Sequence, residues 1–493
     1  MMNHLNYLFA SLLICLAGLP AQAGSIAYRV SPELKSGQLT AVAVEIRFPA
    51  DQPEVTKLHL PDEFAGQSEL WRQVVDFTVE GATVTTPSPA LRTLQRQAGA
   101  SLVVRYRVIS AYATDPKGQD GLPNRALVLS NWFGLLGEVV FAVPEGTGHE
   151  PVTFSWGEKP AGWVMVSDLD HARPLEVESL QESFLYGSND LRLTTLDEKK
   201  TFRLALRGQW KFTDTELGDM LRQLDATERQ FWQDSTSEYF VPLVPLTPLP
   251  KGTLHAGIGR GDAFALYSTT DSTLKGFQWV LAHERLHTWI PLELGGLPEK
   301  DEALEYWFSE GFTDYYTARA LLKSGIWSVD DFIAEQNQML KRYAESPNPL
   351  PNTRILKEFW TDRVVRQVAY DRGRLLATIW DHRLASLPQK TTLGRILRNQ
   401  RVEAMKNQQT KHILTAAKVF PGRYHEAGGA DLKEELERFV EQGQQLKLPE
   451  DLYGDFARIS TVSVEGKPAF QKVTAAPGLT REAFAKCLRL DEE

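Results

Sequence analysis

Cysteine is scarce in this sequence: its 493 residues include only two, Cys15 and Cys487. Cys15 lies in an N-terminal apolar stretch that we expect to be removed, which would leave Cys487 alone. A chain with a single cysteine cannot form an intrachain disulfide, even in an oxidising compartment. We therefore expect the fold to depend on its hydrophobic core and not on covalent cross-links.

Long apolar runs are also missing, apart from residues 8–19 near the N-terminus. That run is too short to span a membrane, and Ala21-Gln22-Ala23 follows it with the small residues typical of a signal-peptide cleavage site. We predict that residues 1–23 are a secretory signal peptide, although no Lys or Arg precedes the apolar run. The mature protein is then expected to be periplasmic or secreted and to have no membrane span.

The sequence has no block of lysine and arginine residues. It contains 63 acidic and 54 basic residues, a net charge of −9, and this balance argues against nucleic acid or an anionic membrane as a partner. With 42% hydrophobic and 10% aromatic residues, the composition is that of an ordinary globular protein. The length suggests about two to four domains, and nothing in the sequence indicates an oligomeric state.

The sequence contains one stretch whose pattern indicates a metal site, His283-Glu284-Arg285-Leu286-His287. In a helix, residues four apart lie on one face, so His283 and His287 can bind one metal ion while Glu284 lies over the same site. This is the pattern of a zinc protease helix. A catalytic zinc site needs a third protein ligand and an open position for water, so the sequence has to supply one more donor.

Glu310 is the predicted third ligand. Trp307, Glu310 and Asp314 follow each other at spacings of three and four, which indicate a second helix. Asp314 would share the inner face of that helix, and it suits the carboxylate that usually accepts the second ring N–H of a metal-bound histidine. Gly311 costs a helix interior about 1 kcal/mol relative to Ala, so it predicts a close contact between two helices.

These residues resemble the gluzincin zinc metallopeptidases, and most closely the glycyl aminopeptidase family. The resemblance rests on three segments: His283–His287 with Trp289 two residues further on, the run Trp307–Tyr315, and residues 369–381. The third segment is similar to the Tyr-x-Lys-Gly helix of the family, but Arg372 stands where Lys is usual. Outside these segments the chain matches the family only in its layout.

The resemblance implies a multidomain α+β fold with one zinc ion per chain and a peptide or protein substrate. It also implies that Tyr370 stabilises the oxyanion of the reaction. In gluzincins, the stretch before the zinc helix holds the edge strand that pairs with the substrate backbone. Gly257, Gly259 and Asp262 therefore become candidates for substrate binding.

Periodic patterns predict the order of the domains. Alternating apolar residues in 39–48 and 101–108 indicate strands, a capping box at Thr213–Glu216 opens a helix, and helical periodicity dominates after Gly325. The predicted layout is a signal peptide (1–23), an N-terminal β-sandwich-like domain (24–210), a thermolysin-like α+β zinc catalytic domain (211–330), a C-terminal helical domain (331–445) and a C-terminal tail (446–493).

Further expectations concern individual segments and residues. Four prolines in residues 239–250 predict an edge strand or extended wall, because proline has no backbone N–H to donate to a neighbouring strand. Residues 262–267 are expected to form a strand. His255 and His382 are interpreted as structural residues. Among the tryptophans, Trp289 is a candidate for lining the cleft.

The predicted reaction is hydrolysis of a peptide bond. Zinc bound by His283, His287 and Glu310 would polarise the scissile carbonyl, and Glu284 would act as the general base for the attacking water. Two alternatives stay open: a zinc endopeptidase, and a secreted binding module whose zinc site is only structural. Glu284 and Tyr370 favour the enzyme, because a structural site needs neither.

The sequence leaves two possibilities for where the enzyme cuts a peptide substrate: at its N-terminus or within the chain. Aminopeptidases of this clan hold the free α-amine of the substrate with carboxylates, typically including a Glu on the edge strand. The matching stretch, residues 257–267, contains no Glu, and Asp262 is its only acid. An aminopeptidase that uses Asp262 is slightly favoured by the resemblance over an endopeptidase.

Overall fold

The computed structural model describes residues 25–49, 53–115, 124–170, 174–410 and 414–492, so the predicted signal peptide lies outside the described part. These residues form two compact units. The first runs to Leu185, apart from Thr114 and Asp115, and the second continues from Tyr186. The finer domain boundaries given above remain a prediction.

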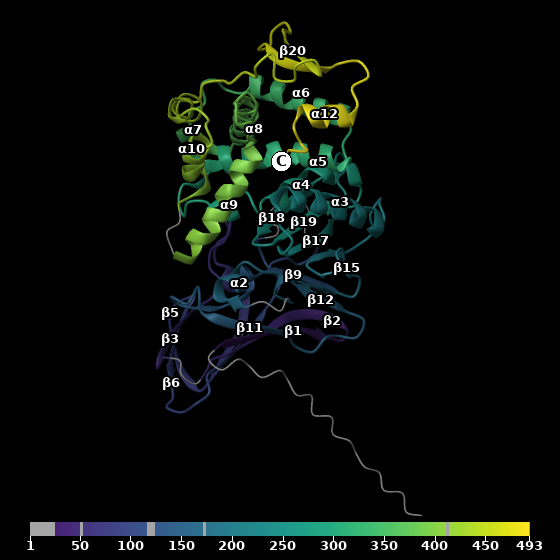
Figure 1. The fold of residues 1–493 in the computed structure, drawn as a ribbon. Helices are drawn as coiled ribbons and strands as arrows, with labels where there is room; N and C mark the ends of the chain where they lie inside the picture. Colours follow the sequence, from purple (N-terminus) through teal and green to yellow (C-terminus); the bar gives the residue numbers. More distant parts are fainter. Residues whose placement is uncertain (1–24, 50–52, 116–123, 171–173, 411–413, 493) are drawn as a thin grey trace, which may run out of the picture. The chain divides into compact units, whose positions relative to one another are not determined.

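The first unit is built from β-strands and two short helices (Figure 1). In β2, Val42, Val44 and Ile46 are buried, as the alternation of the sequence predicts. One sheet has the order β13 (Leu175–Glu176), β11 (Pro151–Trp156), β1 (Ile26–Lys35), β2 (Gln38–Arg47), β7 (Val103–Val108) and β4 (Val74–Glu80). A second has the order β10 (Val143–Pro144), β3 (Val55–His59), β6 (Leu91–Arg96) and β5 (Ala82–Ser88).

Another sheet and the short helices complete the β-rich part of the chain. The sheet has the order β12 (Val164–Ser167), β14 (Phe184–Ser188), β9 (Trp132–Leu136) and β8 (Leu127–Leu129). The helices are α1 (Gly137–Val140) and α2 (Val177–Gln181).

The second unit begins with a mixed sheet of the order β15 (Arg192–Thr195), β16 (Phe202–Leu206), β17 (Tyr239–Leu246), β19 (Ala263–Thr269) and β18 (His255–Arg260). The prediction of an edge position for residues 239–250 is wrong, because β17 is the central strand and pairs in parallel with β16 and β19. Pro242 and Pro245 each lack a donor. Alternate residues of a parallel strand bond to opposite neighbours, so each side of β17 loses one bond and keeps the rest.

The strand expected at residues 262–267 is present as β19, and the glycine-rich stretch before it forms a second strand, β18, so that the two make a hairpin. The strand β18 is the edge of the sheet and pairs antiparallel with β19, with Arg260 opposite Ala263. Gly261 has a φ of +49°, and together with Asp262 it makes the turn. Asp262 therefore lies in the turn and not in the strand, whereas Gly257 and Gly259 lie on the edge strand.

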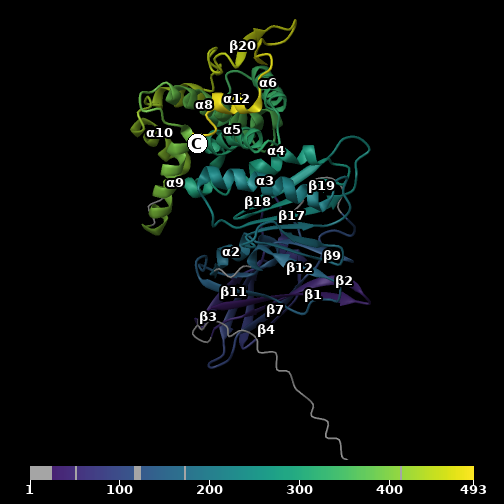
Figure 2. The same ribbon diagram turned by 45° about the vertical axis from the view of Figure 1, so that its right-hand side comes forward.

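Helices make up most of the remaining chain, and α3 and α4 lie on one side of the mixed sheet (Figure 2). The predicted capping box is present, since the Thr213 hydroxyl accepts from Glu216 N at the start of α3. The helices are α3 (Asp214–Trp232), α4 (Leu274–Leu286), α5 (Tyr306–Ser324), α6 (Val329–Glu345), α7 (Asn352–Glu358), α8 (Arg363–Ala385), α9 (Leu393–Thr410), α10 (Ala416–Glu426) and α11 (Lys433–Glu435), with a π-helical turn at Leu436–Glu441.

The C-terminal tail is structured. It contains the hairpin β20 (Ala457–Val462) and β21 (Phe470–Ala475), followed by helix α12 (Arg481–Cys487). Phe484 of α12 is fully buried and packs edge-on against Phe332, with ring centroids 5.4 Å apart. Within the described residues, no helix is long and apolar enough to cross a membrane. The whole is a multi-sheet α+β protein with a helical C-terminal part.

Candidate metal centre

The two histidines lie at the C-terminal end of α4. The helix starts at the N-cap Thr273, and its apolar residues Phe277, Leu281 and Leu286 are buried in the core. That burial fixes the rotation of the helix, which points His283 toward α5. His287 is the C-cap residue and keeps helical backbone angles, so it remains on the same face as His283.

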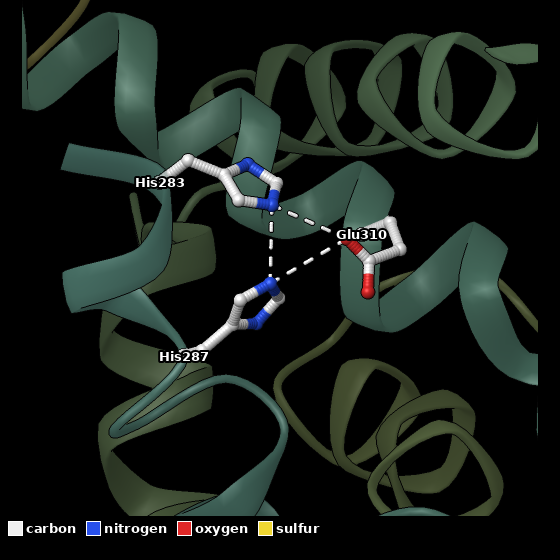
Figure 3. A group of neighbouring side chains, drawn as sticks. All are labelled: His283, His287 and Glu310. Atoms are coloured by element: carbon white, nitrogen blue, oxygen red, sulfur yellow. Dashed lines mark hydrogen bonds and ion pairs between the residues drawn. The ribbon is translucent and has the colours of Figure 1, made fainter. Parts of the chain in front are cut away.

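His283, His287 and Glu310 come together as the sequence predicts (Figure 3). The Nε2 atoms of the histidines are 3.0 Å apart, and Glu310 Oε2 lies 3.2 Å from His283 Nε2 and 3.5 Å from His287 Nε2. Ligands of a tetrahedral ion at 2.0–2.1 Å are about 3.3 Å from each other. The three donor atoms therefore fit a zinc ion.

The other ring nitrogen of each histidine has a hydrogen-bond acceptor. His283 Nδ1 is 2.9 Å from Asp314 Oδ1, and His287 Nδ1 is 2.7 Å from the carbonyl oxygen of Ile290. If each Nδ1–H donates to its neighbour, both Nε2 atoms keep their lone pairs for a metal. The position of Asp314, one turn after Glu310 on α5, agrees with the role predicted for it.

The charge environment also favours a cation between these three residues. Burial by itself lowers the pKa of His283, but hydrogen bonds to Asp314 and Glu310 outweigh it and raise the pKa. Burial by itself raises the pKa of Glu310, yet the two histidines hold it well below its usual range. Ionised carboxylates around paired imidazoles are the donor set expected for zinc.

Tyr370 reaches the same site from α8. Its ring stacks on His283 with centroids 6.0 Å apart. Burial, followed by the carboxylates of Glu310, Asp314 and Glu284, raises the pKa of Tyr370 well above its usual value. The phenol therefore stays protonated at neutral pH and can act as a hydrogen-bond donor.

A glycine pair sets the distance between α5 and α8. A Cβ atom built on Gly311 would lie 2.4 Å from Gly373 Cα, and one built on Gly373 would lie 1.6 Å from the carbonyl oxygen of Trp307. Neither position has room for a side chain, so the helices cross in close contact. The prediction of a close helix contact at Gly311 is confirmed. This crossing holds Glu310 and Tyr370 on neighbouring helices at one site.

A pocket of about 340 Å³ opens beside the histidines. Glu284 and Tyr370 both line it, and burial raises the pKa of Glu284 above its ordinary value. The polar lining residues Glu335, Arg342 and Gln367 could not be identified from the sequence, because they meet only through the packing of α6 on α8. The additional lining residues are Trp279, Val280, Glu335, Arg342 and Gln367.

Arg342, which lines this pocket, forms a bidentate ion pair with Asp371. Arg342 Nη2 is 2.7 Å from Asp371 Oδ1, and Arg342 Nε is 3.0 Å from Asp371 Oδ2. Asp371 follows Tyr370 directly in α8 and is almost completely buried. This bidentate pair fixes α8 against α6 next to the tyrosine.

The edge strand β18 passes next to Glu284. A Cβ atom on Gly259 would lie 3.4 Å from Glu284 Oε2, whereas one on Gly257 would collide with the ring of Phe264. The candidate substrate strand and the candidate base are therefore neighbours. Asp262 is half-buried in the turn beyond Gly259.

Trp289 does not line the cleft, and that prediction is wrong. The residue is fully buried, its Nε1–H donates to Asp234 Oδ2 at 2.9 Å, and the guanidinium of Arg285 lies 4.5 Å from its ring. His255 has a structural partner, as interpreted from the sequence, because its Nδ1 is 2.8 Å from Ser268 Oγ.

Comparison with known proteins agrees with this geometry. Residues 276–354, which contain all three candidate ligands, match the family model described as M61 glycyl aminopeptidase. No curated protein matches the chain.

Solved structures resemble most of the chain. An aminopeptidase N family protein from Idiomarina loihiensis matches with a TM-score of 0.66 and 16% identity over 90% of this chain and 82% of that one. An M1 zinc metallopeptidase from Deinococcus radiodurans matches with a TM-score of 0.50 and 16% identity over 87% and 95%. A variant of the same enzyme, bound to a Tyr-Ser-Ala substrate, matches with a TM-score of 0.51 and 15% identity over 87% and 96%.

At these identities the solved structures show a shared fold, while the family match covers the metal-binding helices themselves. The donor atoms of His283, His287 and Glu310 provide a site of the size and chemistry that zinc requires. Together these findings support a zinc metallopeptidase that is similar to the glycyl aminopeptidases over its metal-binding helices.

Proposed function

We propose that this protein is an exported zinc aminopeptidase that removes residues from the N-terminus of peptides. The observation that carries the proposal is the position of Glu284 and Tyr370 in one pocket with the ligand His283. A purely structural zinc site would need neither an acid beside the ligands nor a buried phenol across from it. Catalysis needs both.

The proposed ligands are His283, His287 and Glu310. A zinc ion held by them would supply a Lewis acid for the scissile carbonyl and would make a water molecule easier to deprotonate. Glu284 accepts a proton from the attacking water and returns it to the leaving amine. Burial raises the pKa of Glu284, which makes it a stronger base than an exposed carboxylate.

Tyr370 is the proposed donor to the oxyanion that develops on the substrate carbonyl. It lies on the side of the pocket formed by α8, and its raised pKa keeps the hydroxyl protonated. A fixed donor at this point costs no reorganisation when the charge develops. The Gly311–Gly373 crossing and the pair between Arg342 and Asp371 hold α8 in place for this task.

The edge strand supports a second candidate, a zinc endopeptidase. Gly259 is the residue of β18 next to Glu284, and it brings no carboxylate to hold a substrate amine. Asp262 lies in the turn that follows β18, so it could bind the α-amine of a substrate only if that amine lay further along the edge of the sheet. An unpaired ammonium is costly to bury, and a site without an anchor would accept N-terminally extended chains.

The deciding experiment uses one peptide in two forms, with a free and with an acetylated N-terminus. The purified mature protein is analysed for zinc, and kcat/KM is then measured for both peptides. We expect one zinc per chain and a fall of about 100-fold on acetylation, as loss of an amine anchor would cause. Equal values of kcat/KM for the two peptides would favour the endopeptidase over the aminopeptidase. The Glu284→Gln variant serves as the inactive control.

Export is part of the same proposal and rests on residues 1–23. N-terminal sequencing of the protein recovered from the periplasm or the medium should begin at Gly24. A product that begins at Met1 in the cytoplasm would contradict export without affecting the peptidase proposal.

A further inference from the structure

A second cavity, of about 60 Å³, lies among α5, α6, α8 and the C-terminal segment. Its lining contains three guanidinium groups, those of Arg319, Arg374 and Arg489, whereas Asp381 is its one carboxylate. None of these residues belongs to the zinc site. The cavity therefore needs its own explanation.

Two buried donors of the lining have no acceptor among the described residues. Gln336 is only 2% exposed, and its Oε1 accepts a hydrogen bond of 3.1 Å from Arg374 Nη2. That bond fixes the orientation of the amide, so the Nε2 group, which can only donate, is left without a partner. Arg489 Nη1 is likewise buried and without an acceptor.

The rest of Arg489 is firmly held, so its free nitrogen is not the result of a mobile side chain. Its Nε donates to Glu492 at 2.9 Å, and its Nη2 donates to the carbonyl oxygen of Thr391 at 2.9 Å. These contacts keep the guanidinium in the cavity wall.

The one carboxylate of the lining is already engaged. Asp381 Oδ2 accepts from the Tyr315 hydroxyl at 2.9 Å, and Asp381 Oδ1 accepts from Leu393 N at 2.8 Å. It therefore does not satisfy Gln336 or Arg489. A buried donor that stays without a partner is costly, and the cost is higher for a charged group.

We propose that this cavity binds a small monovalent anion, for which chloride is the simplest example. An anion accepts from several donors at once and needs no acceptor in return, which matches a lining of guanidinium and amide donors. The size is suitable, because one water-sized particle needs roughly 10 to 15 Å³ of such space. A water molecule would also have to donate, and both oxygens of the one carboxylate in the lining already accept hydrogen bonds.

The anion would tie the C-terminal segment to the helices of the active site. Arg489 follows α12, Gln336 lies on α6 and Arg374 lies on α8, one turn after Tyr370. Arg374 also lies 5.3 Å from the ring of Trp279, which lines the pocket beside the zinc ligands. This role is independent of the peptidase reaction.

The test measures the thermal unfolding midpoint of the full mature zinc protein in sodium bromide, chloride and gluconate at equal ionic strength. We expect a saturable rise of the midpoint with both halides relative to gluconate. Gln336→Glu supplies a carboxylate in place of the anion and should remove the halide dependence. Arg489→Gln should weaken halide binding by about tenfold or more, since it deletes a charged donor, while Lys486→Gln, which removes one exposed charge from α12, should leave it unchanged.

Crystals of the wild-type protein in bromide give a readout that does not depend on any variant. An anomalous peak within hydrogen-bond distance of Gln336 Nε2 and Arg489 Nη1 is expected. Water alone in the cavity, a midpoint that follows only ionic strength, or a halide effect that persists in Gln336→Glu and Arg489→Gln would each overturn the proposal.

Discussion

The crossing of α5 and α8 allows a prediction about a residue that touches no substrate. Gly373→Ala would place a Cβ atom 1.6 Å from the carbonyl oxygen of Trp307, although real contacts of this kind are essentially never under 3.0 Å. The helices must therefore separate by about 1.4 Å at this point, the difference between these two distances. Overpacking of this kind typically costs about 1 to 3 kcal/mol of stability.

The larger effect should fall on the reaction. Tyr370 lies one turn before Gly373 in α8, whereas the proposed zinc ligand Glu310 lies next to Gly311 in α5. A shift of α8 moves the oxyanion donor away from the metal site, and a misplacement of about 1 Å can cost about 100-fold in rate. We expect kcat to fall by about that factor, while zinc content stays near one per chain because no ligand is on α8.

Gly422→Ala is the matched control for this experiment. Gly422 lies within α10, and a Cβ atom there would have nothing within 4 Å. Alanine should therefore raise the free energy of unfolding by about 0.5 to 1 kcal/mol and leave kcat unchanged. A Gly373→Ala protein with normal kcat, or one that loses zinc in proportion to activity, would refute the reasoning about the crossing.

Three further predictions separate the roles of the site residues. Glu284→Gln should keep zinc and abolish turnover, since Glu284 acts on the water and not on the ion; zinc loss in parallel with activity would contradict this. Glu310→Ala should strip the metal, whereas Asp314→Ala should weaken zinc affinity by about 10 to 100-fold, and competition with a chelator compares the two. Tyr370→Phe should lower kcat by about 10²- to 10³-fold with little change in KM, and an unchanged kcat would exclude it from the site.

The metal donors could be predicted from the sequence because helix geometry is local. A spacing of four residues puts His283 and His287 on one face wherever the helix lies. The same helical periodicity predicted that Glu310 and Asp314 share one face of the next helix. The structure brings Glu310 to the two histidines and Asp314 to the ring of His283. The polar wall of the pocket could not be predicted this way, because Glu335 and Arg342 reach it only through the packing of distant helices.

One wrong prediction and one feature that was not predicted have the same origin. The prolines of β17 suggested an edge strand, yet a central parallel strand keeps most of its bonds when each neighbour loses only one. The order of the tail after residue 446 was not predicted, and in the structure Phe484 of this tail packs against the buried ring of Phe332. Local sequence rules describe the secondary structure that a segment prefers by itself. The position of β17 in its sheet and the order of the tail depend instead on contacts with residues that are distant in the chain.

The edge strand β18 shows how one missing side chain can affect substrate choice. Gly259 leaves 3.4 Å between its would-be Cβ and Glu284 Oε2. A carboxylate at this position would lie beside Glu284, and a like charge there would raise the pKa of the base further. Glycine avoids that repulsion and lets a substrate backbone approach the sheet edge. The same absence removes the nearest anchor for an α-amine, so the preference for free N-termini that we propose would depend on Asp262, in the turn after β18.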